Sequence, residues 1–248
     1  LSYDRNSNVT QKVVDAGGLK HTTTTTYNGL QQATSTTVTD ANTPAPFVKK
    51  MEFDVFSRAA GITKDPDGLS IATKKIRNDA GQAIAEVDGE GNMRFLVRDV
   101  LGRVNYKINQ AGGVIQLFYN TNGLVTQETQ YANGIDVSSF QGKPPSGAQV
   151  ASLIKPDSAD VTTHRVYNDD GHMVYKMLGN SLTGFDLDPT GKAVKISRYH
   201  TPLDLSTLTD FTQASIDAAK QTSPKDHITY RIHNEQGYCQ YHIEVHEN

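Results

Sequence analysis

The stretch from Asp65 to Gly123 carries a turn signal at nearly constant spacing. Six times an Asp or Asn is followed three residues later by a Gly, and these glycines lie 13, 10, 11, 10 and 11 residues apart. Asp or Asn at the first position of a type I turn accepts a hydrogen bond from the backbone ahead of it, and Gly at the fourth takes the left-handed conformation. Such a turn commonly joins the strands of a hairpin. The stretch therefore predicts a series of β-hairpins.

The pieces between these turns have the length and pattern of strands. Residues 103–108 alternate apolar and polar side chains, and Met93, Phe95 and Val97 share one face. A period of two is typical of a half-buried strand. Arg77, Arg98 and Tyr119 each precede a turn and lie 21 residues apart. We therefore expect a repeat protein whose unit is a two-strand hairpin.

Composition limits the classes of function. Of the 248 residues, 36% are hydrophobic and the formal net charge is −3, so nothing indicates a nucleic-acid or anionic-membrane partner. No apolar run approaches 18 residues, so no membrane insertion by this segment is expected. The single cysteine, Cys239, allows no internal disulfide. Because the chain starts in repeat-like sequence and lacks an initiator Met, we expect it to be a piece of a longer protein.

The predicted fold is all-β, an antiparallel hairpin-repeat sheet with two short, partly helical insertions. We expect repeat strands over 1–131, an insertion over 132–163, repeat strands over 164–200, a second insertion over 201–226 and terminal strands over 227–248. In the first insertion Ser146 is expected to cap a helix that runs to Ile154 and is stopped by Pro156. In the second, Asp204 or Ser206 is the expected cap of a helix with apolar positions at Leu205, Leu208, Phe211 and Ile216.

The first 64 residues are a degenerate form of the same repeat. Ser7 and Ser57 stand where the turn glycine is expected, and further turns are expected at 15–18 and 27–29. The five threonines of 22–26 indicate a solvated β-branched strand, with O-glycosylation or a binding ladder as alternatives. Residues 41–46, with Pro44 and Pro46, indicate a loop or an irregularity at a sheet edge.

The repeating motif is an aromatic residue, Asp or Asn, two variable residues, Gly, and Arg or a substitute. It resembles the YD repeat of the Rhs (rearrangement hotspot) proteins, the B and C components of bacterial Tc insecticidal toxins, and teneurins. The matching segments cover about three quarters of the chain, in ten Asp/Asn-x-x-Gly turns; the clearest are 53–58, 98–104, 119–124 and 167–173. The aromatic is replaced at Arg77, Arg98, Leu187 and His233, so the copy is diverged.

The resemblance implies a sheet that spirals into a hollow shell around a toxic C-terminal polypeptide. A chain of this length would supply a strip of such a wall, joined to the remaining repeats of a larger shell. The implied protein is not an enzyme, needs no cofactor and is secreted or at the surface of a bacterium. The alternative is a cell-surface carbohydrate-binding or adhesion module on the same repeats. Aromatic side chains that point inward and are buried would favour the shell hypothesis. A row of aromatic side chains that faces solvent would favour the carbohydrate-binding hypothesis.

Three groups of residues are candidates for chemistry. Residues 65–69, Asp-Pro-Asp-Gly-Leu, match the start of the self-cleavage signal that lies at the end of Rhs shells. Because more repeats follow these residues, we predict a Pro-containing turn there instead. We predict the same kind of turn at Asp188-Pro189. Imidazole, thiolate and carboxylate groups could hold a metal near the C-terminus, although a solvated strand face explains them equally. Those groups are His227, His233, Cys239, His242, Glu244 and His246. No catalytic, cofactor or metal residue is therefore assigned.

Tyrosines are the remaining candidates. Stacking on sugars is the functional interpretation, and packing on the sheet is the structural one. The set comprises Tyr106, Tyr119, Tyr131, Tyr167 and Tyr199.

Overall fold

The computed structural model describes residues 1–42, 46–208, 210–234 and 236–245. Pro44 of the expected loop and His246 of the expected C-terminal group lie outside these residues. The chain divides into two units. The first comprises Leu1–Val97 and Ser138–Pro145, and the second comprises Arg98–Val137 and Ser146–Asn248.

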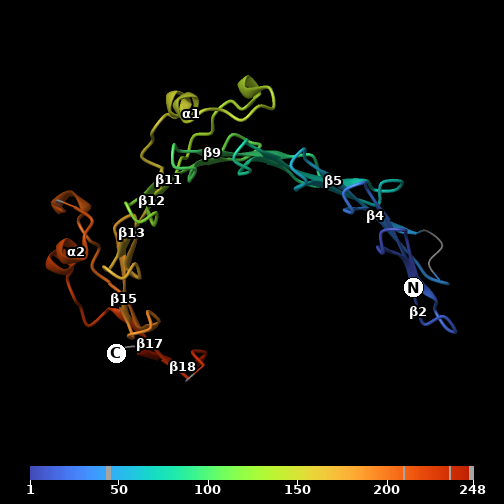
Figure 1. The fold of residues 1–248 in the computed structure, drawn as a ribbon. Coiled ribbons are helices and arrows are strands. Elements are labelled where there is room, and N and C mark those ends of the chain that lie inside the picture. The colour runs from blue at the N-terminus through green and yellow to red at the C-terminus, as the bar shows by residue number, and fades with distance from the viewer. Residues whose placement is uncertain (43–45, 209, 235, 246–248) are drawn as a thin grey trace. The chain divides into compact units, whose positions relative to one another are not determined.

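The first unit is a meander in which each strand pairs antiparallel with the next. Its strands, blue to green in Figure 1, are β1 (Ser2–Tyr3), β2 (Val9–Val14), β3 (His21–Tyr27), β4 (Ala33–Thr39), β5 (Phe47–Phe53), β6 (Ala59–Lys64), β7 (Ile71–Arg77), β8 (Ala83–Val87) and β9 (Met93–Arg98). The threonine run forms most of β3, which confirms the predicted β-branched strand.

The second unit repeats the same antiparallel order, again with each strand beside its sequence neighbour. Its strands are β10 (Val104–Ile108), β11 (Val114–Tyr119), β12 (Val125–Gln130), β13 (Val161–Tyr167), β14 (Met173–Leu178), β15 (Ser181–Leu187), β16 (Ala193–Arg198), β17 (His227–His233) and β18 (Cys239–Val245). The predicted all-β hairpin repeat is confirmed. Strand β13 begins inside the range expected as an insertion.

The turn at Asp99 represents the repeating connection. The Gly102 N–H donates to the Asp99 carbonyl at 2.9 Å. The Asp99 carboxylate accepts from the Leu101 and Arg103 N–H groups at 3.0 and 2.9 Å. Gly102 takes φ +81°, a conformation that a Cβ resists. The sequence pattern thus corresponds to a defined hydrogen-bonded loop.

A β-bulge accompanies this turn in hairpin after hairpin. The residue before the turn Asp or Asn lies opposite the residue six positions later, and one residue of the returning strand is left over. Examples of these bulged pairs are Tyr27–Ala33, Phe53–Ala59, Arg77–Ala83, Tyr119–Val125, Tyr167–Met173 and Leu187–Ala193. A bulge increases local twist and fixes register.

The degenerate turns keep the same backbone without the glycine. Ser7, Gln31 and Ser57 have φ of +65°, +62° and +64° at the position of the turn Gly. For Ser7 and Ser57, the prediction that they occupy the position of the turn glycine is confirmed. The turn expected at 27–29 in fact runs from Asn28 to Gln31. These side chains occupy a conformation that costs a non-glycine residue roughly 1–2 kcal/mol.

Two of the ten predicted turns are built differently. Gly18 and Gly68 are not left-handed, which corrects the prediction that every fourth-position glycine would be. Instead Asp65 has φ +48° and Ser70 φ +49°, and the Ser70 N–H closes the loop on the Asp65 carbonyl at 2.7 Å. The loop from Asp15 to Lys20 is closed in the same way. The longer loop moves the positive φ angles to its two ends.

The first insertion contains a 3₁₀ turn, Ser138–Phe140, and helix α1 (Gly147–Leu153). Ser146 caps α1, and its backbone N–H donates to the Gln149 side chain in a capping box, so the predicted cap is confirmed. Phe140 packs edge-on against Phe95 of β9, with ring centroids 5.8 Å apart.

The second insertion differs from the prediction. Asp204 caps a single 3₁₀ turn, Leu205–Thr207, and the helix itself, α2 (Gln213–Ala219), starts later and is capped by Thr212. The apolar spacing misled because Leu205 and Leu208 pack from an irregular segment against the same cluster that buries Ile216. Both α1 and α2 lie on the same side of the second unit's strands (Figure 1).

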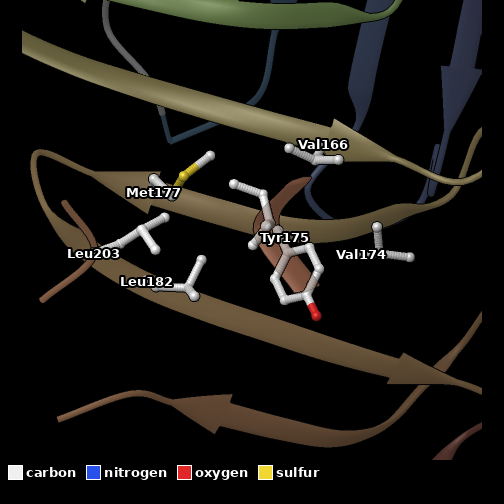
Figure 2. Packing of buried hydrophobic residues seen from close by; sticks show 7 residues of the cluster. Val166, Val174, Tyr175, Met177, Leu182 and Leu203 are labelled. Carbon is white, nitrogen blue, oxygen red and sulfur yellow. The ribbon is translucent and has the colours of Figure 1, made fainter. Parts of the chain in front are cut away.

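The main hydrophobic cluster lies beneath α2. It joins strands β13, β14 and β15 to the second insertion (Figure 2), and its buried members are Val166, Val174, Tyr175, Met177, Leu182, Leu203 and Ile216. Met177 and Ile216 are fully buried. Core packing is therefore concentrated where an insertion covers the sheet.

Replacing Gly102 with Val should lower the free energy of unfolding by roughly 1–3 kcal/mol, because a β-branched side chain resists positive φ. Urea denaturation measures the change. Ser57→Gly is the opposite control: relief of strain should raise the free energy of unfolding by up to about 1 kcal/mol, after the entropic cost of the new glycine. Equal midpoints for all three chains would contradict the turn assignment.

Candidate functional site

Bonds between successive turns recur on one edge of the sheet. In three hairpins the tyrosine before the turn donates its hydroxyl to a backbone carbonyl of an earlier strand. The pairs are Tyr27 to Val9 at 2.9 Å, Tyr119 to Val104 at 2.7 Å and Tyr167 to Val125 at 2.9 Å. Each acceptor lies two residues after the left-handed residue of the preceding turn on that edge. We call these bonds the turn staples.

Arginine makes the same bond where the tyrosine is replaced. The Arg77 Nη2 donates to the Ala59 carbonyl at 3.2 Å, and Ala59 lies two residues after the left-handed Ser57. A diverged copy of the motif thus retains the staple. The sequence marks the aromatic position, but its role was missed. The donor and acceptor are 18, 15 and 42 residues apart in the three tyrosine pairs, so no fixed spacing in the sequence signals the bond.

The arginine that follows the turn glycine joins the staple to the turn. Arg103 Nε donates to Asp99 Oδ2 at 2.8 Å, and its guanidinium carbon lies 4.6 Å from the Tyr119 ring centroid. Arg103 Nη1 also reaches the Asn120 carbonyl at 3.3 Å. One side chain therefore contacts two successive turns through an ion pair, a cation–π contact and a backbone bond.

Hydrogen bonding keeps the turn carboxylates ionised. The backbone N–H of Arg58 lowers the pKa of Asp54, with its side chain adding to the effect. The pKa of Asp188 is lowered by the Thr190 hydroxyl and the Lys192 N–H. These bonds favour the charged form of each carboxyl group. The carboxylates therefore act as hydrogen-bond acceptors that hold their own turns. In the Asp65 turn, the carboxylate accepts the Leu69 N–H at 3.0 Å, which fits a structural role there as well.

The five candidate tyrosines are engaged with the protein. Tyr119 and Tyr167 form staples, and Tyr106 is buried at 5% exposure. Tyr131 donates to Gln116 Oε1 at 2.5 Å, and Gln116 Nε2 donates to the Tyr106 hydroxyl at 3.0 Å.

Tyr199 lies against Gly184, so close that a Cβ at position 184 would stand 3.3 Å from the Tyr199 ring. This set of tyrosines therefore does not form a solvent-facing row.

A polar anchor holds α2 to the sheet. The Tyr175 hydroxyl donates to Asp217 Oδ1 at 2.6 Å, and Lys220 Nζ donates to the Tyr175 hydroxyl at 2.6 Å. Lys220 also forms an ion pair with Asp217. Burial, followed by the bond to Asp217, raises the pKa of Tyr175 to about 12.

The C-terminal histidine group is dispersed. His242 and Glu244 share a face of β18, with His242 Nε2 3.6 Å from Glu244 Oε1. His227 Nε2 lies 3.9 Å from the other Glu244 oxygen. His233 lies opposite Cys239 in the hairpin register. Within the described residues, no three His, Cys, Asp or Glu side chains gather in a geometry that could hold a metal ion.

A cleft of about 760 Å³ opens between the second insertion and two turns. It is lined by residues that include Asn120, Asn168, Phe211 and Asp217. Phe211 stacks on His164, with ring centroids 4.0 Å apart. Among the described residues, no helix has the length and apolar character needed to cross a membrane.

Comparison with known proteins gives likenesses of shape only. No family model and no curated protein matches the sequence. A crystal structure of TcdB2-TccC3 with Cdc42 aligns over 96% of this chain and 14% of its own, at 12% identity and TM-score 0.46. The crystal structure of TcdB2-TccC3 without its hypervariable C-terminal region aligns over 94% of this chain and 13% of its own, at 12% identity and TM-score 0.45.

The structure of a Photorhabdus luminescens Tc holotoxin pore aligns over 97% of this chain and 14% of its own, at 8% identity and TM-score 0.40. The chain thus spans only about a seventh of these neighbours. At these scores the likenesses carry no weight in assigning a role.

Tyr119→Phe should lower the free energy of unfolding by about 1 kcal/mol, because the Val104 carbonyl loses its partner. Tyr238→Phe is the matched control, since Tyr238 is 73% exposed. Chemical denaturation of both variants measures the difference. A Tyr119→Phe loss no greater than that of the control would show that the staple contributes nothing to stability.

The anchor should make stability fall at alkaline pH. A raised pKa means that the Tyr175 contribution is complete below the unfolded value near 10 and is lost as pH approaches the folded value of about 12. Between about pH 9 and 11.5 the wild type should lose at most about 2 kcal/mol more than Tyr175→Phe. Denaturation curves at each pH test this. Parallel losses in both chains would contradict the anchor.

Proposed function

We propose that this chain is a non-catalytic strip of YD-repeat wall in a secreted bacterial toxin, joined to further repeats that enclose or scaffold a toxic C-terminal polypeptide. The observation that carries the proposal is the engagement of the motif tyrosines. Tyr27, Tyr119 and Tyr167 donate to the carbonyls of earlier strands. An aromatic that ties one repeat to another contributes to a wall and has its hydroxyl occupied.

The chemistry of the turns supports a structural role. The charged groups of the Asp99 turn have internal partners: Asp99 holds its own loop, and Arg103 links that loop to Tyr119 and Asn120. Ion pairs and hydrogen bonds of this kind position a backbone. The repeated polar bonds compensate for a sheet with few buried apolar side chains.

The alternative is a surface module that binds carbohydrate. The cleft between the second insertion and the turns at Asn120 and Asn168 favours it, because polar residues and the aromatic Phe211 line it together. A wall could also carry such a cleft, so the two roles need separate tests.

The first test is the intact mass of the natural product that contains this segment, followed by limited proteolysis. For a wall, we expect a product several times longer than 248 residues, with a distinct C-terminal polypeptide that resists protease until the shell is denatured. A product of about this length that binds glycans on an array, with binding lost in Phe211→Ala, would overturn the enclosing role and support the alternative.

A further inference from the structure

The second unit carries a tyrosine at one register position in every fourth strand. The left-handed glycines Gly102, Gly171 and Gly237 are each followed four residues later by a tyrosine. The three strands read Tyr106-Lys-Ile in β10, Tyr175-Lys-Met in β14 and Tyr241-His-Ile in β18. The intervening strands have Gln127 and Lys195 at the same position. The repeat of two strands thus lies within a longer repeat of four.

The strand register places the three tyrosines on one face of the sheet. Pairing joins Tyr106 to Gln116, Gln116 to Thr129 and Thr129 to Thr162. His164, on the same face as Thr162, lies opposite Met177, which shares a face with Tyr175.

From Tyr175 the row continues through Gly184, Ser197 and Ile228 to Val245. Val245 and Tyr241 are four residues apart in β18 and so share that face.

Two of these tyrosines are covered by a short capped helix. Tyr106 is 5% exposed, and α1 contacts β10, with the Gly147 Cβ position 3.9 Å from the Tyr106 ring. Tyr175 is 6% exposed and is bound to Asp217 and Lys220 at α2. Each helix follows the strand two positions after the one it covers: α1 follows β12, and α2 follows β16.

The two helices share a simple chemistry. Each has seven residues, a Ser or Thr cap at Ser146 or Thr212, and one fully buried aliphatic side chain, Val150 or Ile216. A short helix of this kind is too small to be stable alone, so the tyrosine face and the helix stabilise each other.

The third tyrosine is uncovered. Tyr241 is 62% exposed and Ile243 is 48% exposed. Directly opposite them on β17 lie Ile232 and Tyr230, at 49% and 41% exposure. The face continues to Val245 opposite Ile228. We call the six side chains of Ile228, Tyr230, Ile232, Tyr241, Ile243 and Val245 the terminal apolar face.

We propose that the terminal apolar face is a third docking site of this series and binds a short Ser/Thr-capped helix, with one central aliphatic residue, that is carried by a further repeat of the same polypeptide. The period of four strands from β10 to β14 selects β18 as the next covered strand. Stable interfaces between separate proteins bury roughly 800 Å² per partner, whereas this face consists of six side chains on two strands. A tethered segment avoids this limit because tethering raises its effective concentration.

The proposal concerns how the repeats are covered and does not rest on the enclosing role. The chain contains no tryptophan, so Tyr241→Trp provides a single fluorescent reporter on the face, opposite Ile232. In the 248-residue chain we expect Trp emission typical of an exposed indole, with ready quenching by acrylamide. The matched reporter at a covered site, Tyr106→Trp, should be blue-shifted and protected.

The decisive variant carries a second copy of residues 179–226 appended after residue 248, which supplies two strands and the α2 insertion. In this chain we expect the Trp at position 241 to shift to the blue and its quenching constant to fall severalfold. The change Ile216→Asp in the appended copy alone should restore exposure. Protection that survives this change, or no protection while hydrogen exchange shows the appended strands paired, would overturn the proposal.

A measurement in trans covers the case in which the appended strands do not pair. The peptide of residues 199–226 is titrated into the Tyr241→Trp chain. Saturable protection that is abolished by Ile243→Asp supports the site, and no protection up to millimolar peptide overturns it. Protection that instead grows with the concentration of the Tyr241→Trp chain alone would assign the face to a second copy and would also overturn the proposal.

Discussion

A left-handed residue at the end of the four-residue turn governs the geometry of most hairpins in this chain. It lets the chain reverse within four residues while the preceding Asp or Asn accepts two backbone N–H groups. The reversal fixes the bulge, and the bulge fixes which residue faces which across the hairpin. Glycine satisfies the constraint at Gly102, whereas Ser57 satisfies it under strain. The backbone geometry is therefore retained even where the side chain is unfavourable.

The turn staples convert a row of hairpins into a continuous strip. An isolated hairpin is marginal in water, because two strands bury little apolar surface. Here Tyr119 reaches past its own hairpin to the Val104 carbonyl, and Arg103 reaches forward to the Asn120 carbonyl. Polar bonds between successive repeats thus supply order where the apolar core is thin. The same bonds occupy the aromatic and charged groups that might otherwise be taken for a binding or catalytic site.

The helical insertions cover apolar surface on one face of the sheet. Where strands β13 to β15 carry large side chains, the second insertion covers them, and Ile216 and Leu203 complete the cluster. Gly184 leaves room for the rings of Tyr175 and Tyr199. The polar bonds from Asp217 and Lys220 to the Tyr175 hydroxyl then orient the helix on the sheet. Apolar faces and insertions therefore belong together in this fold.

Local structure in this chain can be predicted from its amino-acid sequence. The spacing of Asp, Asn and Gly predicted the hairpins and the antiparallel sheet, and Ser146 predicted the start of α1, because these features depend on neighbours a few residues away. The same spacing predicted the wrong conformation at Gly68, where the loop is one residue longer. The apolar pattern also placed the second helix too early, since burial of Leu205 arises from distant packing.

The roles of the side chains depend on contacts that are distant in the sequence. The partner of the Tyr167 hydroxyl lies 42 residues earlier, and the partner of Tyr175 lies 42 residues later. Both pairings depend on how many strands intervene and on which face each residue falls. A local pattern fixes the turn that presents a tyrosine, and the register of the whole sheet fixes what that tyrosine meets.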